Sequence, residues 1–210
     1  PVSAWSRPQR VYPEEPDSVR EKRVEVTRDV SRSYVRVGFK DPRAGLDGQR
    51  LLKKAILAEI LVDLFLGKSS PLYERLYDEG LIDERFSCAT MAERDYGAVV
   101  IAAESDRYEQ FVQELLDGIE DLRKSFQSGN AEEPFEEGFT RVVRKTVGQT
   151  MRLLDSPEAV AYEFNRDFFN GFTPFDRLRV LHQVRAEDAW EELAHTFDQE
   201  RCSIAIVRPQ

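Results

Sequence analysis

The first residues to test for chemistry are His182 and His195, the two histidines of this 210-residue chain. An inverted zinc motif, H-x-x-E-H, needs two imidazoles about one helical turn apart, so that their nitrogens converge on one ion. His182 and His195 are thirteen positions apart and fall in different expected helices. The sequence therefore assigns no catalytic residue and no metal ligand to this chain.

The nearest alternative to a zinc motif pairs His195 with Glu191 or Glu192. Spacings of three and four residues place a carboxylate and an imidazole on one helix face, where either could contribute to a metal site. The same spacings are common on solvated helix surfaces, and a histidine near a helix C-terminus also interacts favourably with the helix dipole. The solvated surface is the preferred interpretation of these residues.

Nucleophilic and phosphate-binding motifs are absent from the sequence. Cys88 and Cys202 fall in strand-like segments, where a thiol behaves as a small apolar side chain, so neither a reactive thiol nor a disulfide is expected. No G-x-S-x-G elbow occurs. Gly45 and Gly48 flank a loop before a helix, but the lysine and the further glycines of a phosphate-binding loop are missing.

Composition excludes several classes of partner. The chain is 41% hydrophobic and 33% charged, with a formal net charge of −9, which is typical of a globular protein with its own core. Without a block of Lys and Arg, neither nucleic acid nor an anionic membrane is expected as a partner. No long apolar run or signal-peptide pattern occurs, and a cytoplasmic location is therefore expected.

Arg75 and Tyr77 are the candidate substrate-binding residues. A guanidinium and a phenol on one short helix could hydrogen-bond the carbonyl groups of a peptide if both faced a cavity. In the alternative interpretation, Tyr73 and Tyr77 pack partly under a sheet while Arg75 is exposed. The sequence alone leaves both interpretations open.

Periodicity predicts the elements that would position these residues. Period-two alternation indicates strands, and apolar residues three and four apart indicate helices. Two strands are predicted within 22–40, a hairpin over 86–93 and 97–104, and a last strand over 202–207. Helices are predicted over 47–66, from Ser70 to Gly80, and over 108–126, 135–154, 157–169, 175–182 and 187–197.

The order of these elements predicts an α+β fold. Strands that arrive in adjacent pairs, with grouped helices between them, favour an antiparallel sheet of about five strands packed against a layer of helices. Residues 1–20 contain Pro1, Pro8, Pro13 and Pro16 and are expected to be an extended interdomain linker. Residues 21–210 are expected to form a single α+β domain.

The segment SSPLYERLYDEGLID, a strand hairpin, a long amphipathic helix and the segment MRLLDSPEAVAYEF together resemble the pitrilysin/insulinase-type (inverzincin) zinc metallopeptidases. The resemblance covers about Arg20 to Val207 and is strongest to the C-terminal, non-zinc domain of the bacterial YmfH- and YmfF-like branch. It implies a fold like that of mitochondrial processing peptidase domains. In such families an arginine and a tyrosine of the C-terminal half hold the substrate backbone. The matching stretch here, Leu76–Asp83, is one residue shorter, with Tyr77 and Asp83 at those two positions, so Arg75 and Tyr77 are the candidate stand-ins.

The resemblance implies a non-catalytic C-terminal domain that forms a wall of a peptide-binding chamber and positions substrate for an upstream zinc domain. The chain alone is expected to be inactive and without a cofactor, while zinc and proteolysis belong to the parent protein. Its expected partners are the homologous N-terminal zinc domain and an unfolded peptide substrate. The sequence does not decide whether the protein also forms a dimer. The alternative is a pseudo-peptidase scaffold or partner-subunit domain with no proteolytic role.

Overall fold

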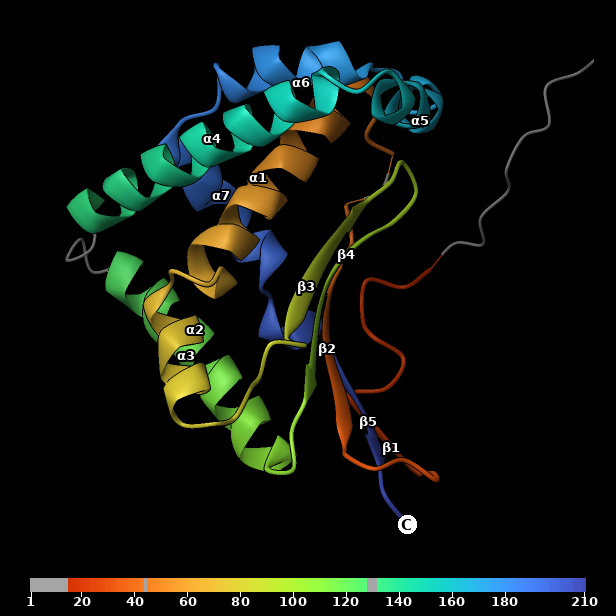
Figure 1. Ribbon diagram of the computed structural model, residues 1–210, viewed down its shortest axis with the longest axis vertical. Coiled ribbons are helices and arrows are strands. Elements are labelled where there is room, and N and C mark those ends of the chain that lie inside the picture. Colours follow the sequence, from red (N-terminus) through yellow and green to blue (C-terminus); the bar gives the residue numbers. More distant parts are fainter. Residues whose placement is uncertain (1–14, 44, 128–131) are drawn as a thin grey trace, which may run out of the picture.

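The protein is described by a computed structural model that covers residues 15–43, 45–127 and 132–210. A five-stranded sheet is its central element (Figure 1). The strands are β1 (Arg23–Thr27), β2 (Tyr34–Asp41), β3 (Ser87–Ala92), β4 (Gly97–Glu104) and β5 (Cys202–Arg208), in the spatial order β1-β5-β2-β4-β3. The predicted linker falls mostly on residues 1–14, which lie outside the described residues.

The sheet is mixed, with one parallel pair at one edge. β1 runs parallel to β5, with Val24 opposite Ala205. The other three pairs, β5 with β2, β2 with β4, and β4 with β3, are antiparallel. The last strand of the chain therefore lies between its first two strands. Apart from this edge the sheet is antiparallel, and the predicted fold class is confirmed.

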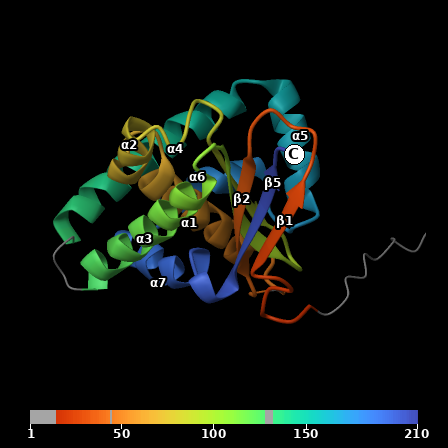
Figure 2. The ribbon, with the colours of Figure 1, turned by 90° about the horizontal axis from the view of Figure 1, so that it is seen from below.

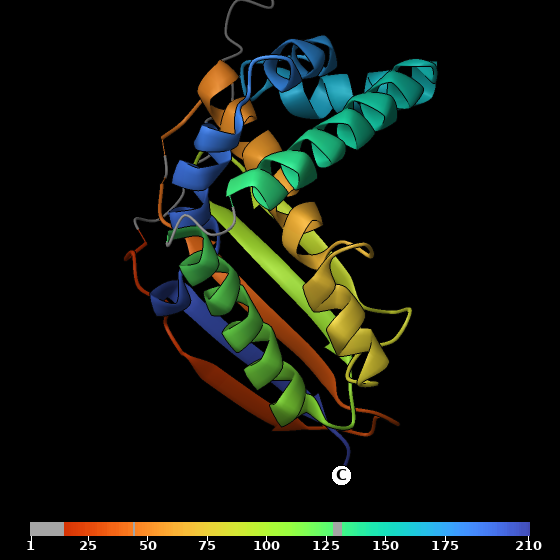
Figure 3. The ribbon, with the colours of Figure 1, turned by 90° about the vertical axis from the view of Figure 1, so that its left-hand side faces the viewer.

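Seven helices are described alongside the sheet. They are α1 (Gly48–Leu66), α2 (Pro71–Asp78), α3 (Tyr108–Gln127), α4 (Glu132–Leu154), α5 (Pro157–Phe168), α6 (Pro174–Leu181) and α7 (Ala186–Thr196), and a short 3-10 turn, η1 (Gln199–Arg201), precedes β5. α1, α2, α3 and α7 cover one face of the sheet, and α4 crosses over α1 (Figure 3). No helix in the described ranges is long and apolar enough to cross a membrane.

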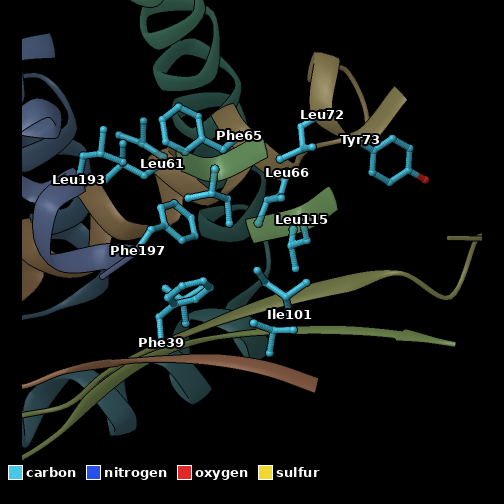
Figure 4. Packing of buried hydrophobic residues seen from close by; sticks show 14 of the residues in the cluster. Phe39, Leu61, Phe65, Leu66, Leu72, Tyr73, Ile101, Leu115, Leu193 and Phe197 are labelled. Carbon is cyan, nitrogen blue, oxygen red and sulfur yellow. The ribbon is translucent and has the colours of Figure 1, made fainter. Parts of the chain in front are cut away.

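The core lies between α1, α7 and the helix-facing side of the sheet. Strand alternation buries Val35, Val37 and Phe39 of β2 on this side, as expected when one face of a sheet is covered. Phe197 packs edge-on against Phe39, with ring centroids 5.4 Å apart, and lies 5.7 Å from Phe65 of α1 (Figure 4). These aromatic contacts join the first long helix to the last.

The other face of the sheet has no covering helix within the described chain (Figure 1). Residues 15–22 cross one end of this face, where Lys40 Nζ donates to Glu15 Oε2 and to the Pro16 carbonyl, both at 2.8 Å. Ser203 Oγ donates to the Glu21 carbonyl at 2.7 Å. The described chain therefore enters the domain across the uncovered face.

The turn between α1 and α2 is fixed by Ser70. Its hydroxyl accepts from the Tyr73 amide at 3.1 Å and donates to the Phe65 carbonyl at 2.8 Å, which satisfies one orphan group at each helix end. At the other end of α2, Gly80 has φ +65° and supplies the left-handed residue that stops the helix. Both signals were predicted from the sequence.

We expect Ser70→Ala to lower the free energy of unfolding by about 2 kcal/mol, because two buried hydrogen bonds are lost at once. Ser156 caps α5 at a less buried position, with the Ala159 amide at 3.3 Å. Ser156→Ala is the matched control and should cost about 0.5–1 kcal/mol. Urea unfolding of both variants checks this, and equal losses would contradict the role assigned to Ser70.

Candidate functional site

The two predicted substrate-binding residues lie on different sides of α2. Tyr77 is 47% exposed, and its ring stacks on Tyr73 with centroids 6.0 Å apart. Arg75 points toward α3, where its guanidinium lies 3.9 Å from the Glu114 carboxylate. Tyr73 is buried, whereas Tyr77 is exposed. α2 therefore does not bring Arg75 and Tyr77 together on one surface.

Tyr73, which stacks on Tyr77, lines a groove that combines apolar and charged residues. The groove has a volume of about 590 Å³ and lies between the C-terminal half of α1, the turn into α2, and β3. Its apolar lining includes Val62, Leu66, Tyr73 and Phe86. Tyr73 and Phe86 meet edge-on with centroids 5.5 Å apart, which fixes one end of the groove.

β3 forms one wall of this groove and is an edge strand of the sheet. The Glu93 amide bonds to the Tyr96 carbonyl at 2.9 Å at the hairpin turn. Hydrogen-bonded and non-bonded pairs alternate in an antiparallel ladder. Because Glu93 bonds to Tyr96, every second residue before Glu93, namely Met91 and Ala89, also bonds to β4 through its backbone. The backbone groups of the residues between them, Thr90 and Cys88, point away from β4. The outer edge of β3 thus offers unpaired peptide groups beside the groove, within the described chain.

Charged residues of both signs line the rim of the groove. Lys145 of α4 pairs with Asp63 of α1 at 2.7 Å, and Glu59 pairs with Arg177 of α6. Lys68 also lines the groove. The rim of the groove therefore carries charges of both signs within the described chain.

Both cysteines behave as apolar side chains. Burial raises the pKa of the Cys88 thiol to about 12 and that of Cys202 to about 11. A thiol with so high a pKa carries almost no thiolate at neutral pH and is a poor nucleophile. Although Cys88 lines the groove, it is therefore part of the wall and has no reactive role.

The histidines are not part of a metal site in the described residues. His182 caps the C-terminus of α6, and His195 lies in the last turn of α7. Across 15–43, 45–127 and 132–210, no three His, Cys, Asp or Glu side chains are close enough to hold a metal ion together. These residues do not fit a zinc centre, and no catalytic step is assigned to them.

A buried charge cluster, which the sequence did not reveal, lies near His195. Arg43 donates to Asp41 at 2.5 Å and to both carboxylate oxygens of Glu192, one of them at 2.9 Å. Lys54 donates to the Arg43 carbonyl at 2.9 Å and lies 3.1 Å from Asp41. Lys54 is 5% exposed and Glu192 7%, so the interpretation that placed Glu192 on a solvated helix surface is wrong.

The cluster joins three segments that are distant in the sequence: the end of β2, α1 and α7. Burial alone would raise the pKa of Asp41, but hydrogen bonds from Arg43 and the charge of Lys54 hold that pKa below its ordinary value. One sequence signal was available. Glu192 stands between Ala189 and Leu193, two residues of the buried face of α7, and a carboxylate at such a position needs a buried partner.

The fold and the groove define a class of protein: an α+β domain with a one-sided sheet and no metal-binding constellation among its described residues. The profile of the Peptidase M16 inactive domain matches residues 2–133, more than half of the chain. The chain belongs to this family, as an inactive domain of the M16 zinc proteases, which are the pitrilysin/insulinase-type enzymes. The resemblance predicted from the sequence is thereby confirmed.

Individual relatives agree with this assignment. The zinc protease YmfH of Bacillus subtilis (strain 168) is 28% identical over 196 residues, covering 93% of this chain and 44% of YmfH. An M16-like peptidase from Alicyclobacillus acidocaldarius superposes with a TM-score of 0.87 at 23% identity, covering 96% of this chain and 47% of that one. A protease from Helicobacter pylori gives a TM-score of 0.73 at 19% identity, with coverages of 94% and 46%. The chain spans less than half the length of these relatives.

Proposed function

We propose that this domain forms a wall of a peptide-binding chamber and holds an extended segment of substrate for a zinc domain elsewhere in the parent protein. One observation carries the proposal: the outer edge of β3 borders the groove that Tyr73 and Phe86 close. An extended peptide can add to a free sheet edge through main-chain hydrogen bonds and place alternate side chains in an adjacent groove. That mode of binding positions a backbone with little dependence on sequence.

The proposed division of labour follows from the side chains present. The described residues offer no metal ligand set and no thiol of low pKa, so we assign orientation and not bond cleavage to the domain. Of the two candidate substrate-binding residues, Tyr77 stacks on Tyr73 of the groove lining, and Arg75 lies on the α3 side of α2. The parent, with zinc in its other half, is the enzyme.

Thr90→Pro in the full-length parent tests the proposal. Proline removes the outward-pointing amide of residue 90 and places its ring at the sheet edge, without removing a bond to β4. The loss of one main-chain bond together with the blocked approach should lower kcat/KM for an unstructured peptide about tenfold. Thr90→Val keeps the amide and a side chain of the same shape, and should behave like the wild type.

Ala89→Pro supplies the opposite control, because residue 89 bonds to β4. It should lower the melting temperature sharply, whereas Thr90→Pro should melt near the wild type. A well-folded Thr90→Pro parent with unchanged kcat/KM would refute peptide binding along β3. A wild-type parent that binds no zinc and cleaves no peptide would favour the scaffold alternative instead.

A further inference from the structure

Helix α5 differs from the other helices of the domain in how little of it is buried. Asp167 is the one buried residue of its twelve. A helix this short is marginally stable without tertiary contacts. Figure 2 shows α5 at the margin of the molecule, where it packs against α4 and α6.

The exposed surface of α5, the following turn and the start of α6 is rich in aromatic residues. We call it the α5 aromatic surface; it consists of Tyr162, Phe164, Phe168, Phe169 and Phe175. Tyr162 is 71% exposed and Phe169 76%. Phe168 stacks on Phe164 and meets Phe169 edge-on, with centroids 5.8 Å apart in both pairs. Phe164, Phe168 and Phe169 therefore form one group of touching rings, and an exposed aromatic group of this kind on a domain marks an interaction site.

The turn that presents Phe169 is held by the rest of the domain. Arg94, in the β3–β4 turn, donates to the Phe169 carbonyl at 3.2 Å, and Asn170 donates its side-chain amide to Glu93 at 3.1 Å. The Gly48 amide at the start of α1 donates to the Asn170 carbonyl at 2.8 Å. The rings are therefore held out in solvent by an ordered backbone, and little conformational entropy would be lost on docking.

The entry point of the chain lies at the same end of the sheet. Lys40, which binds Glu15 and Pro16, stands opposite Ala98 of β4, and Ala98 stands opposite Met91 of β3. The β3–β4 turn that follows Met91 carries Arg94, the partner of Phe169. Polypeptide that precedes residue 15 thus joins the domain at the end of the sheet where the α5 aromatic surface lies.

We infer that the α5 aromatic surface is the docking site for the homologous zinc-bearing half of the parent protein. The inference rests on the proposed function for the existence of that half. The relatives are more than twice as long as this chain, which leaves room for a second half of similar size. The chain enters the domain at the end of the sheet near α5, and this gives the location of the docking site. We extend the docking surface to the uncovered sheet face, which carries apolar residues such as Val100 and Val207.

Hydroxyl-radical footprinting of the intact parent tests this inference. Tyr162 and Tyr77 have the same intrinsic reactivity, so their oxidation rates report exposure. In this domain by itself Tyr162 is the more exposed, 71% against 47%, and it would oxidise faster. In the parent we expect the order to reverse, with Tyr162 at least about threefold slower than Tyr77 and Phe169 protected as well.

A Tyr162 that oxidises faster than Tyr77 in the parent would overturn the inference. Two further outcomes would also overturn it: protection that follows the dimer fraction in sedimentation velocity assigns the surface to a second copy, and protection that needs added peptide assigns it to substrate. Thr90→Pro separates this inference from the proposed function. Protection that persists while Thr90→Pro leaves kcat/KM unchanged would refute groove binding and leave α5 docking intact.

Discussion

Arg43→Met is expected to lower the free energy of unfolding by about 3 kcal/mol. Removal of the guanidinium leaves Glu192, 7% exposed, without its cation, and an uncompensated buried charge typically costs 3–5 kcal/mol. The expected loss lies at the lower end of this range because Arg43 is itself 28% exposed, and water partly screens its charge. Urea unfolding, with the midpoint and slope measured separately, gives the value.

The double variant Arg43→Met/Glu192→Leu is the control for this prediction. With both charges removed, an apolar pair of similar volume should recover most of the loss, because a buried ion pair and its hydrophobic replacement are often close in energy. A double variant no more stable than Arg43→Met would show that the guanidinium acts through packing and not through its charge.

The same variant should change the acid dependence of stability. The pKa of Asp41 is lowered in the folded protein, so its contribution is complete above its ordinary value of 3.8 and is lost as the pH falls through the lower folded pKa. Arg43→Met removes the hydrogen bonds that lower this pKa. The variant should therefore lose less stability than the wild type between pH 4 and the onset of acid unfolding.

Phe197→Ala is the second change with a large expected effect, about 3–5 kcal/mol. The ring is fully buried and contacts Phe39 of β2 and Phe65 of α1. Its loss opens a cavity at the point where α7, α1 and the sheet meet. Surrounding backbone from three elements cannot collapse into that space without breaking its own hydrogen bonds, so most of the cavity should persist.

Phe197→Leu is the matched variant and should lose only about 1–2 kcal/mol, because most of the volume is kept. Chemical denaturation followed by circular dichroism compares the two. If Phe197→Ala lost no more than Phe197→Leu, the site would be able to relax, and Phe197 would not hold the two layers together.

Local features of the fold could be predicted from the sequence, because each is encoded by neighbouring residues. Ser70 and Gly80 bound α2 as expected, and alternation identified β2 and β4. The parallel pairing of β1 with β5 could not be predicted, since it joins residues about 180 positions apart and depends on where the helices leave room. α4 also begins earlier than expected, at Glu132 and not at 135.

The candidate site could be predicted from the sequence less completely than the fold. Arg75 and Tyr77 were chosen as neighbours in the chain, but a separation of two residues turns them to different sides of a helix. The groove combines α1, β3 and α4, and only folding brings these together. Glu192 was expected on a solvated surface because its partner Arg43 lies in another element.

The position of β5 between β1 and β2 has a consequence for biosynthesis. Because the final strand is inserted into the interior of the sheet, the N-terminal strand has no neighbour until the ribosome has released the last residues of the domain. Until then β2 presents an open edge to solvent or to a chaperone. The domain should therefore complete its fold only after β5 has left the ribosome, whereas any polypeptide ahead of it has had time to form its own structure.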